Sequence, residues 1–238
     1  MIAPFPISGV TLRIFPFAPI DSRMYLLIDD EGDNRDTALI VDPCENVGAV
    51  EFLKQAGVAR CIVILTHEHY DHISGVNFLR ERFPCRVVCT EACAAAIALP
   101  KKNLSQYFEA LFADRPENIR QMVRSLNIRP YSCEANAPFA GESTHFSWGR
   151  HTVRLVATPG HSPGSLCALI DEKVVFTGDS LLSDGSTVTR LPGGNRSDFD
   201  RRVLPLFRQL SPDLLVLPGH GDPSRFGDLF DKLSNRNK

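Results

Sequence analysis

Residues 61–72 read CIVILTHEHYDH, an apolar run followed directly by a dense group of polar side chains. The apolar part has the length and the β-branched composition of a buried strand. Four potential metal ligands follow within six residues: His67, His69, Asp71 and His72. Packing so many polar groups together without an ion would leave them poorly satisfied, because buried polar groups need partners. The stretch therefore predicts a metal site at the end of a strand.

The same arrangement recurs three times further along the chain. Mostly apolar runs at 153–157, 174–176 and 214–217 are each followed by a glycine and then at once by a potential ligand, namely His161, Asp179 and His220. Ligands of open α/β sheets bind beyond the strand ends, and glycine there permits tight turns and close backbone approach. A single His or Asp after a strand is more often a capping or surface residue. Four such strand ends in one chain favour a shared metal site.

The number of candidate ligands suits two ions better than one, because a zinc ion commonly takes four ligands and a catalytic ion keeps one position open. The set is His67, His69, Asp71, His72, His161, Asp179 and His220. Three histidines on the first ion and three residues on the second, with Asp179 bridging, would leave room for a shared hydroxide. Ligand counting alone does not assign the residues to the two ions.

Composition excludes several other classes of protein. The chain has 238 residues with 43% hydrophobic side chains, which fits one large domain over residues 1–238. Lys and Arg number 26 against 28 Asp and Glu, with no run of five like charges, so we expect no nucleic-acid partner. No window approaches the roughly 20 apolar residues of a membrane helix, and residues 1–7 do not resemble a signal peptide. We therefore expect no membrane partner and a cytoplasmic location, with the seven cysteines reduced and mostly structural.

The order of the expected elements predicts an α/β fold, with helices covering a sheet. Strands are expected at 10–17, 24–28, 38–41 and 61–65, with helices after Asp42, ending near Gly57, and at 73–83. Residues from about 92 to 130 look helical and are interpreted as an insertion that caps the site. Strands are expected again at 152–157, 166–170, 173–176 and 214–217, with a helix at 198–210.

Four motifs in this order resemble the metallo-β-lactamase superfamily. They are THEHYDH at 66–72, TPGHSPG at 158–164, FTGDS at 176–180 and LPGHGD at 217–222. The resemblance implies a four-layer αβ/βα sandwich with metals at the edge between two sheet-containing halves. LPGG at 191–194 and PGHG at 218–221 make the chain most similar to the short bacterial glyoxalase II-like, or hydroxyacylglutathione hydrolase-like, group.

The resemblance also implies roles for the candidate ligands. His67, His69 and His161 would hold the first metal, Asp71, His72 and His220 the second, and Asp179 would bridge them. The expected ions are two divalent metals, zinc first, with iron or manganese as alternatives. The implied enzyme is a binuclear hydrolase whose metal-bound hydroxide attacks a small-molecule acyl substrate, a thioester or another ester or lactone. Asp71 would be the catalytic residue that orients the nucleophile.

Candidate substrate contacts are Tyr70 and Arg190, although Tyr70 could equally pack beneath its loop. An acyl pocket could be formed by Phe108, Leu111, Phe112 and Met122, or these side chains could be core. A substrate carboxylate or phosphate could be held by Lys101, Lys102, Arg190 and Arg196, or these could be solvated charges. Cys44 is interpreted as a structural thiol rather than part of the site mouth. His145 and His151 match no ligand of the family.

Hydrolysis of small phosphodiesters is a weaker possibility within the same superfamily. Two functions of other classes also stay open from the sequence. A mononuclear iron persulfide dioxygenase would bind one iron through two histidines and one aspartate. A metal-bound binding module without turnover would keep the ligands but hydrolyse nothing.

Overall fold

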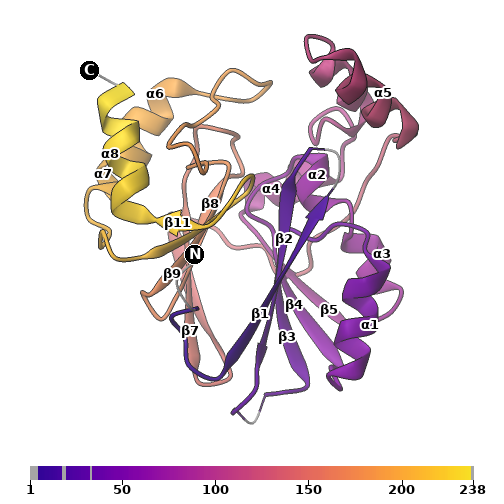
Figure 1. Cartoon of the computed structure of the whole chain (residues 1–238), viewed down its shortest axis with the longest axis vertical. Helices are drawn as coiled ribbons and strands as arrows, with labels where there is room; N and C mark the ends of the chain where they lie inside the picture. The colour runs from indigo at the N-terminus through magenta and orange to yellow at the C-terminus, as the bar shows by residue number, and fades with distance from the viewer. Residues whose placement is uncertain (1–4, 18–19, 33, 237–238) are drawn as a thin grey trace.

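The structure is a computed structural model that describes residues 5–17, 20–32 and 34–236. Two β-sheets face each other, one from each half of the chain (Figure 1). The first has the order β1-β2-β3-β4-β5 and contains β1 (Val10–Phe17), β2 (Ser22–Asp29), β3 (Thr37–Val41), β4 (Arg60–Ile64) and β5 (Cys85–Val88). The second has the order β11-β10-β9-β8-β7-β6 and contains β6 (Ser143–Trp148), β7 (His151–Ala157), β8 (Leu166–Ile170), β9 (Val174–Gly178), β10 (Leu215–Pro218) and β11 (Ser224–Arg225).

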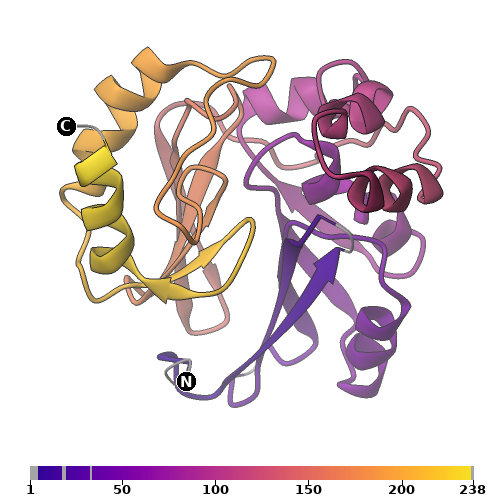
Figure 2. The same ribbon diagram turned by 45° about the horizontal axis from the view of Figure 1, so that its top comes forward.

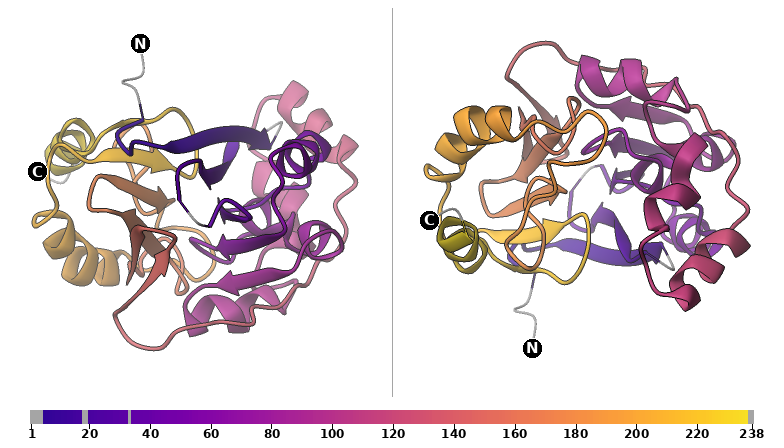
Figure 3. Two further views of the ribbon diagram at one scale, coloured as in Figure 1. Left: turned by 90° about the horizontal axis from the view of Figure 1, so that it is seen from below. Right: turned by 90° about the horizontal axis from the view of Figure 1, so that it is seen from above.

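Helices cover the outer side of each sheet, as both views in Figure 3 show. The N-terminal half carries α1 (Val47–Gln55), α2 (Tyr70–Ile73), α3 (Val76–Arg80), α4 (Glu91–Ile97), the 3-10 helix η1 (Ser105–Phe112) and α5 (Glu117–Ser125). The C-terminal half carries α6 (Arg196–Asp198), the π-helical turn η2 (Phe199–Val203), α7 (Leu204–Phe207) and α8 (Phe226–Arg236). Within the described ranges, no helix combines the length and apolar character needed to cross a membrane.

Hydrophobic clusters fill the spaces between the four layers. One cluster joins α1 to the first sheet and includes Leu53 and Val63. A second lies between the two sheets and includes Leu39 and Phe176. A third joins the second sheet to the C-terminal helices and includes Phe226. The expected αβ/βα sandwich is therefore confirmed.

Strand direction brings all four ligand-bearing strand ends to one end of the molecule. In the first sheet, β4 is parallel to both β3 and β5. In the second, β10 is parallel to β9, and β7 has the same direction because β8 is antiparallel to both β7 and β9. The loops that follow β4, β7, β9 and β10 can therefore meet at one edge.

Two expected helices are broken into shorter pieces. The helix expected over 73–83 is replaced by α2 and α3, with the break at Gly75. A Cβ atom at Gly75 would lie 2.5 Å from the carbonyl carbon and oxygen of Cys44, so only glycine allows the loop after β3 to approach this closely. The helix expected at 198–210 consists of α6, η2 and α7.

The helical segment expected at 92–130 divides into two parts. Its first helix, α4, packs into the core, where Cys93 and Ile97 are fully buried against the first sheet. Helices η1 and α5 lie outside the layers at one end of the N-terminal half, as Figure 2 shows. The elements that the sequence did not predict are β5, β6, β11 and α8. All seven cysteines are free, and six of them are buried.

Candidate metal centre

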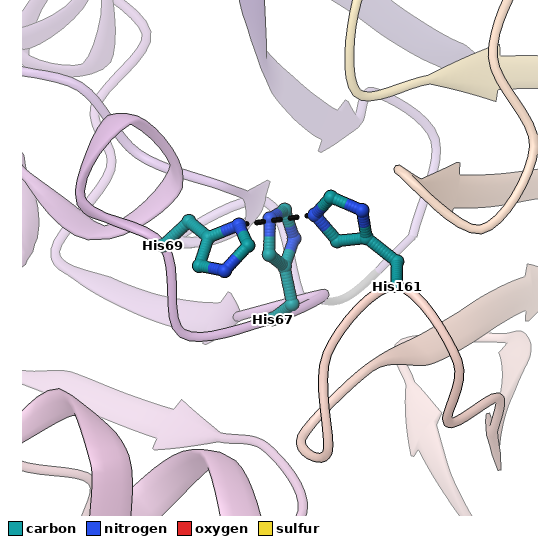
Figure 4. Close-up of side chains that lie close together, drawn as sticks. All are labelled: His67, His69 and His161. Carbon is teal, nitrogen blue, oxygen red and sulfur yellow. Dashed lines mark hydrogen bonds between the residues drawn. The ribbon is translucent and has the colours of Figure 1, made fainter. Parts of the chain in front are cut away.

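The first group of candidate ligands is formed by three buried histidines. His67 and His69 follow β4, and His161 reaches them from the loop after β7 (Figure 4). One ligand atom from each lies within 4.8 Å of the other two. Nε2 of His161 is 3.0 Å from Nδ1 of His69. The two halves of the chain thus share one cluster.

A second group lies beside the first and combines Asp71, His72 and His220. Oδ2 of Asp71 lies 3.2 Å from Nε2 of His72 and 3.3 Å from Nε2 of His220. The two Nε2 atoms are themselves 3.3 Å apart. All three potential ligand atoms therefore point into one small space.

Asp179 stands between the two groups. Its Oδ2 lies 3.5 Å from Nε2 of His161, in the first group, and 3.5 Å from Nε2 of His220, in the second. Its Oδ1 lies 3.6 Å from Nε2 of His72. This position allows one carboxylate to reach both groups.

The hydrogen bonding of these residues is incomplete in a way that fits metal ions. Among the described residues, Nε2 of His67, Nε2 of His69 and Oδ1 of Asp179 are buried and have no hydrogen-bond partner. Leaving a buried polar atom unpaired costs about 1–3 kcal/mol, so such atoms call for an explanation. Imidazole nitrogen and carboxylate oxygen are ligands that zinc and related ions bind. The donor set therefore fits transition-metal ions.

Charge differs between the two groups. Burial lowers the pKa of His67 and His161 and brings that of His69 to about 3, so these rings are neutral, as metal binding requires. Burial also disfavours charge on His220, but the carboxylates of Asp179 and Asp71 outweigh it and raise its pKa to about 9. The negative charge that would hold a proton there would equally hold a metal cation.

Asp42 supports the centre, although the sequence analysis names it only as the residue that precedes a helix. Its buried carboxylate accepts hydrogen bonds from the amide of Thr66 at 2.7 Å and from its hydroxyl at 2.5 Å. The same carboxylate lies 2.9 Å from Nδ1 of His72 and so fixes the ring whose other nitrogen faces Asp71. Asp42 and His72 are 30 residues apart, and no spacing in the sequence links them.

Strand β2 supports the His220 loop across the gap between the halves. The Tyr25 hydroxyl donates to the carbonyl of Pro218 at 2.7 Å, and the Arg23 amide donates to the carbonyl of Gly219 at 2.8 Å. Nδ1 of His220 lies 3.1 Å from the carbonyl oxygen of Ile20. These contacts orient His220 from the opposite half of the molecule.

A cavity of about 750 Å³ opens over the centre. Its lining includes Tyr70, Asp71 and Arg190, together with Phe108, Leu111 and Phe112 from η1. The Tyr70 ring also meets the Phe108 ring edge-on, with 5.2 Å between centroids, so Tyr70 both lines the cavity and packs. Helix η1 thus forms a wall of the cavity, in agreement with the predicted cap.

The other candidates are distributed more widely. Met122 is 43% exposed and is absent from the described cavity linings, so these linings do not support its assignment to the acyl pocket. Lys101 and Lys102 line a second cavity of about 540 Å³. Arg196 is likewise outside the described linings and pairs with Asp200, with 2.8 Å between Nε and Oδ1.

The remaining side chains named from the sequence belong to neither ligand group. Cys44 is buried in the core, which raises the pKa of its thiol to about 11, as expected for a structural thiol. His151 binds Asp171, with 2.6 Å between Nδ1 and Oδ2, at the start of β7. His145 lies on β6.

Comparisons with known proteins agree with this geometry. The family model of the metallo-β-lactamase superfamily matches residues 22–220. The probable metallo-hydrolase YqgX of Bacillus subtilis is 29% identical over 211 residues, which cover 88% of this chain and 89% of that protein. The probable polyketide biosynthesis zinc-dependent hydrolase BaeB of Bacillus velezensis is 21% identical over 205 residues, covering 86% of this chain and 76% of that protein.

Solved structures show the same fold. BLEG-1 B3 metallo-β-lactamase superimposes with a TM-score of 0.72 and 27% identity, covering 93% of this chain and 97% of that chain. ETHE1 from Myxococcus xanthus superimposes with a TM-score of 0.67 and 22% identity, covering 94% of this chain and 83% of that chain. The chain therefore belongs to the metallo-β-lactamase superfamily.

Proposed function

We propose that this protein is a binuclear metal-dependent hydrolase that cleaves an acyl thioester in the cavity over the metal centre. The observation that supports it most directly is the meeting of two ligand groups around Asp179, with buried nitrogen and oxygen atoms left without hydrogen-bond partners among the described residues. His67, His69 and His161 would hold one ion, and Asp71, His72 and His220 the other, with Asp179 shared. Zinc is the proposed metal, because BaeB is named a zinc-dependent hydrolase.

When bound, the ions would lower the pKa of a coordinated water to about 7 and polarise the scissile carbonyl. The protein's part is to orient the nucleophile and the substrate. Burial alone would raise the pKa of Asp71, but His72 and His220 hold it well below its usual range. Asp71 therefore stays ionised at neutral pH and can accept a hydrogen bond from the attacking water.

Tyr70, which precedes Asp71 in α2, is the proposed hydrogen-bond donor to the substrate. Its phenol lines the cavity, and burial raises its pKa to about 12, so it stays protonated at neutral pH. A protonated phenol can donate a hydrogen bond to a substrate oxygen. The apolar side chains of Phe108, Leu111 and Phe112 would pack against the acyl group.

Metal analysis of protein purified without added metal or chelator tests the binuclear assignment. We expect about two zinc ions per chain, from the ligand count and the usual coordination number. About one iron per chain would contradict the proposal and favour a persulfide dioxygenase, which oxygen uptake with glutathione persulfide would reveal. Two ions without hydrolysis of any thioester, ester or lactone would instead indicate a binding module.

Replacement of Asp71 tests the catalytic role. Asp71→Ala should lower thioester hydrolysis by at least about a hundredfold, because the nucleophile loses its orienting carboxylate. Circular dichroism should show that the fold is kept. Asp228→Ala, a change on the exposed side of α8, is the matched control and should leave the rate unchanged. An active Asp71→Ala protein would refute the assignment.

A further inference from the structure

Two cysteines lie side by side at the beginning of the neighbouring strands β4 and β5 (Figure 1). Cys61 and Cys85 are partners in the parallel register of these strands. Partners in neighbouring strands lie about 4.8 Å apart, and their side chains leave the same face of the sheet. Disulfide-bonded cysteines have their Cα atoms about 4.4–6.8 Å apart, so the backbone holds this pair at a distance that a disulfide bond can span.

The two thiols also share one packing environment. Cys61 is buried in the hydrophobic cluster between the first sheet and α1, and the half-buried Cys85 packs against the same cluster. A hydrogen bond between the two side chains lowers the pKa of Cys85 and, together with burial, raises that of Cys61. The positive charge of Arg80 lowers the pKa of Cys85 further. The thiolate, which is the reactive form of cysteine, therefore forms more readily at Cys85.

Cys85 is also the thiol that reagents in solution can reach. Its neighbours in sequence, Pro84 and Arg86, are exposed. The other six cysteines, all of which lie within the described ranges, are buried. Cys89 and Cys93 form a second close pair, but both side chains are fully buried. Access and a neighbouring thiol are thus combined at Cys85.

We propose that Cys85 and Cys61 are oxidised by hydroperoxides to a reversible disulfide bond, which fastens the ligand-bearing segment between them. Cysteines that respond to oxidants are accessible, form thiolates readily and often lie beside a second cysteine that completes the disulfide. Cys85 has the first role and Cys61 the second. The inference is independent of the proposed hydrolysis, because neither cysteine belongs to a ligand group or to the described cavity linings.

The reaction has two steps. The Cys85 thiolate attacks the terminal oxygen of the hydroperoxide, so that an S–O bond forms, the O–O bond breaks, and the alkoxide leaves and takes a proton from water. The sulfur of Cys61 then attacks the sulfenic acid of Cys85, so that the S–S bond forms, the S–O bond breaks, and hydroxide leaves with the Cys61 proton as water. The two thiols lose two electrons, and the hydroperoxide gains them.

The disulfide would close a loop that contains four of the proposed metal ligands. His67, His69, Asp71 and His72 all lie between residues 61 and 85. A disulfide stabilises the folded state mainly because it restricts the unfolded chain. Cys61 lies at the end of β4 opposite to the ligands, which follow the strand. Oxidation therefore fastens this segment from outside the metal centre.

Peptide mapping of the metal-loaded protein tests the pair directly. The protein is treated with a small excess of hydrogen peroxide, the remaining thiols are blocked with iodoacetamide, and the digest is analysed by mass spectrometry. We expect the loss of two of the seven thiols, a peptide pair linked through Cys61 and Cys85, and full recovery with dithiothreitol. A link between Cys89 and Cys93 instead, or seven thiols that all stay free, would overturn the proposal.

The rate of alkylation tests the assignment of Cys85 as the first reactant, and it requires no variant to fold. In the unmodified protein, iodoacetamide should label Cys85 at least about tenfold faster than any other cysteine, because the thiolate is the nucleophile and the other thiols are buried. Labelling of Cys85 no faster than that of the buried cysteines would contradict this role.

Two variants separate the two steps. In Cys61→Ser the sulfenic acid of Cys85 has no partner, so dimedone, which labels sulfenic acids, should mark Cys85 after peroxide treatment. In Cys85→Ser, Cys61 should stay a free thiol. The matched control is Cys133→Ala, because Cys133 is buried in the same cluster, and it should form the disulfide at an unchanged rate. Dimedone on Cys61 but not on Cys85 would refute the proposed order.

Thermal unfolding tests the fastening of the segment. Oxidation should raise the melting temperature of the metal-loaded protein by about 5 °C or more, from the entropy that the closed loop removes from the unfolded chain. Dithiothreitol should reverse the rise, and Cys61→Ser treated with peroxide in the same way should show none. An unchanged melting temperature in protein that mapping shows to be cross-linked would overturn the stabilising role.

Discussion

Asp42 adopts a backbone conformation that side chains rarely take, with φ of 51°. Its carboxylate bonds to Thr66 and to His72, and the buried partners hold it in place. A strained backbone conformation of this kind persists only where the surrounding contacts hold it, and such positions are common at functional sites. Asp42 therefore orients a ligand ring without itself belonging to the seven proposed ligands.

Asp42→Ala should lower the metal content of the second group, because the His72 ring loses the partner that fixes it. Loss of such a supporting carboxylate commonly costs about 10–100-fold in metal affinity. Metal analysis after dialysis against a weak chelator measures the loss.

The control for this prediction is Asp171→Ala. Asp171 also has φ of 51°, and it binds a histidine, His151, remote from the centre. Its replacement should reduce stability but not metal content. Equal metal retention in Asp42→Ala and Asp171→Ala would contradict the role of Asp42.

At the residue scale, the candidate ligands that lie close together in the sequence could be predicted from it. His67, His69, Asp71 and His72 lie together in sequence, and the structure places their side chains at one edge. Asp42 and Tyr25 were missed because their roles depend on contacts between distant segments, 30 residues apart for Asp42 and His72 and 193 for Tyr25 and Pro218. No local pattern records such contacts.

At the element scale, the break between α2 and α3 depends on Gly75. Gly75→Ala should lower the free energy of unfolding by about 1–3 kcal/mol, because the new methyl group would meet the Cys44 backbone. Gly57→Ala is the control, since Gly57 has φ of 74° but nothing within 4 Å of the added Cβ. That variant should cost about 1 kcal/mol through backbone strain alone.

Urea unfolding monitored by circular dichroism gives both values. The difference between the two free energies of unfolding separates the cost of the close contact at Gly75 from the cost of adding a methyl group to a glycine. Gly75→Ala as stable as the unmodified protein would show that the loop after β3 can move away.

The elements that the sequence missed are short or weakly patterned. Strand β5 has four residues and includes Arg86, and β6 is partly exposed along its length. The break at Gly75 was missed because a lone glycine within an apolar helical pattern does not show what its backbone approaches. Strands β3 and β4 were predicted because most of their residues are apolar and buried, which leaves a continuous hydrophobic run in the sequence.

At the scale of the whole molecule, the two halves meet at the metal centre. His67 and His69 come from the first half, and His161, Asp179 and His220 from the second. Bound ions would therefore link the halves in addition to the cluster between the sheets. The α/β class was predictable from the order of the expected strands and helices, whereas the contacts between the halves were not.

Metal removal should lower the melting temperature by about 5 °C or more. Ions that bind the folded state at about 100 times their Kd stabilise it by about 2.7 kcal/mol, and a chain of this size loses about 2–4 °C per kcal/mol. Calorimetry before and after chelation measures the change, and added zinc should reverse it. Chelator presaturated with zinc is the control, and an unchanged melting temperature would argue against ions that join the halves.

The hydrogen bonds that join Ile20, Arg23 and Tyr25 to residues 218–220 have a consequence for biosynthesis. Pro218, Gly219 and His220 are oriented by Tyr25, Arg23 and Ile20, which are made about two hundred residues earlier. A ribosome-bound chain that has not yet released residue 220 carries the ligands of the 66–72 loop without the partner that completes their second group. Such a nascent chain lacks one proposed ligand of the second group, so we expect that group to bind an ion stably only after the His220 loop has folded against β2.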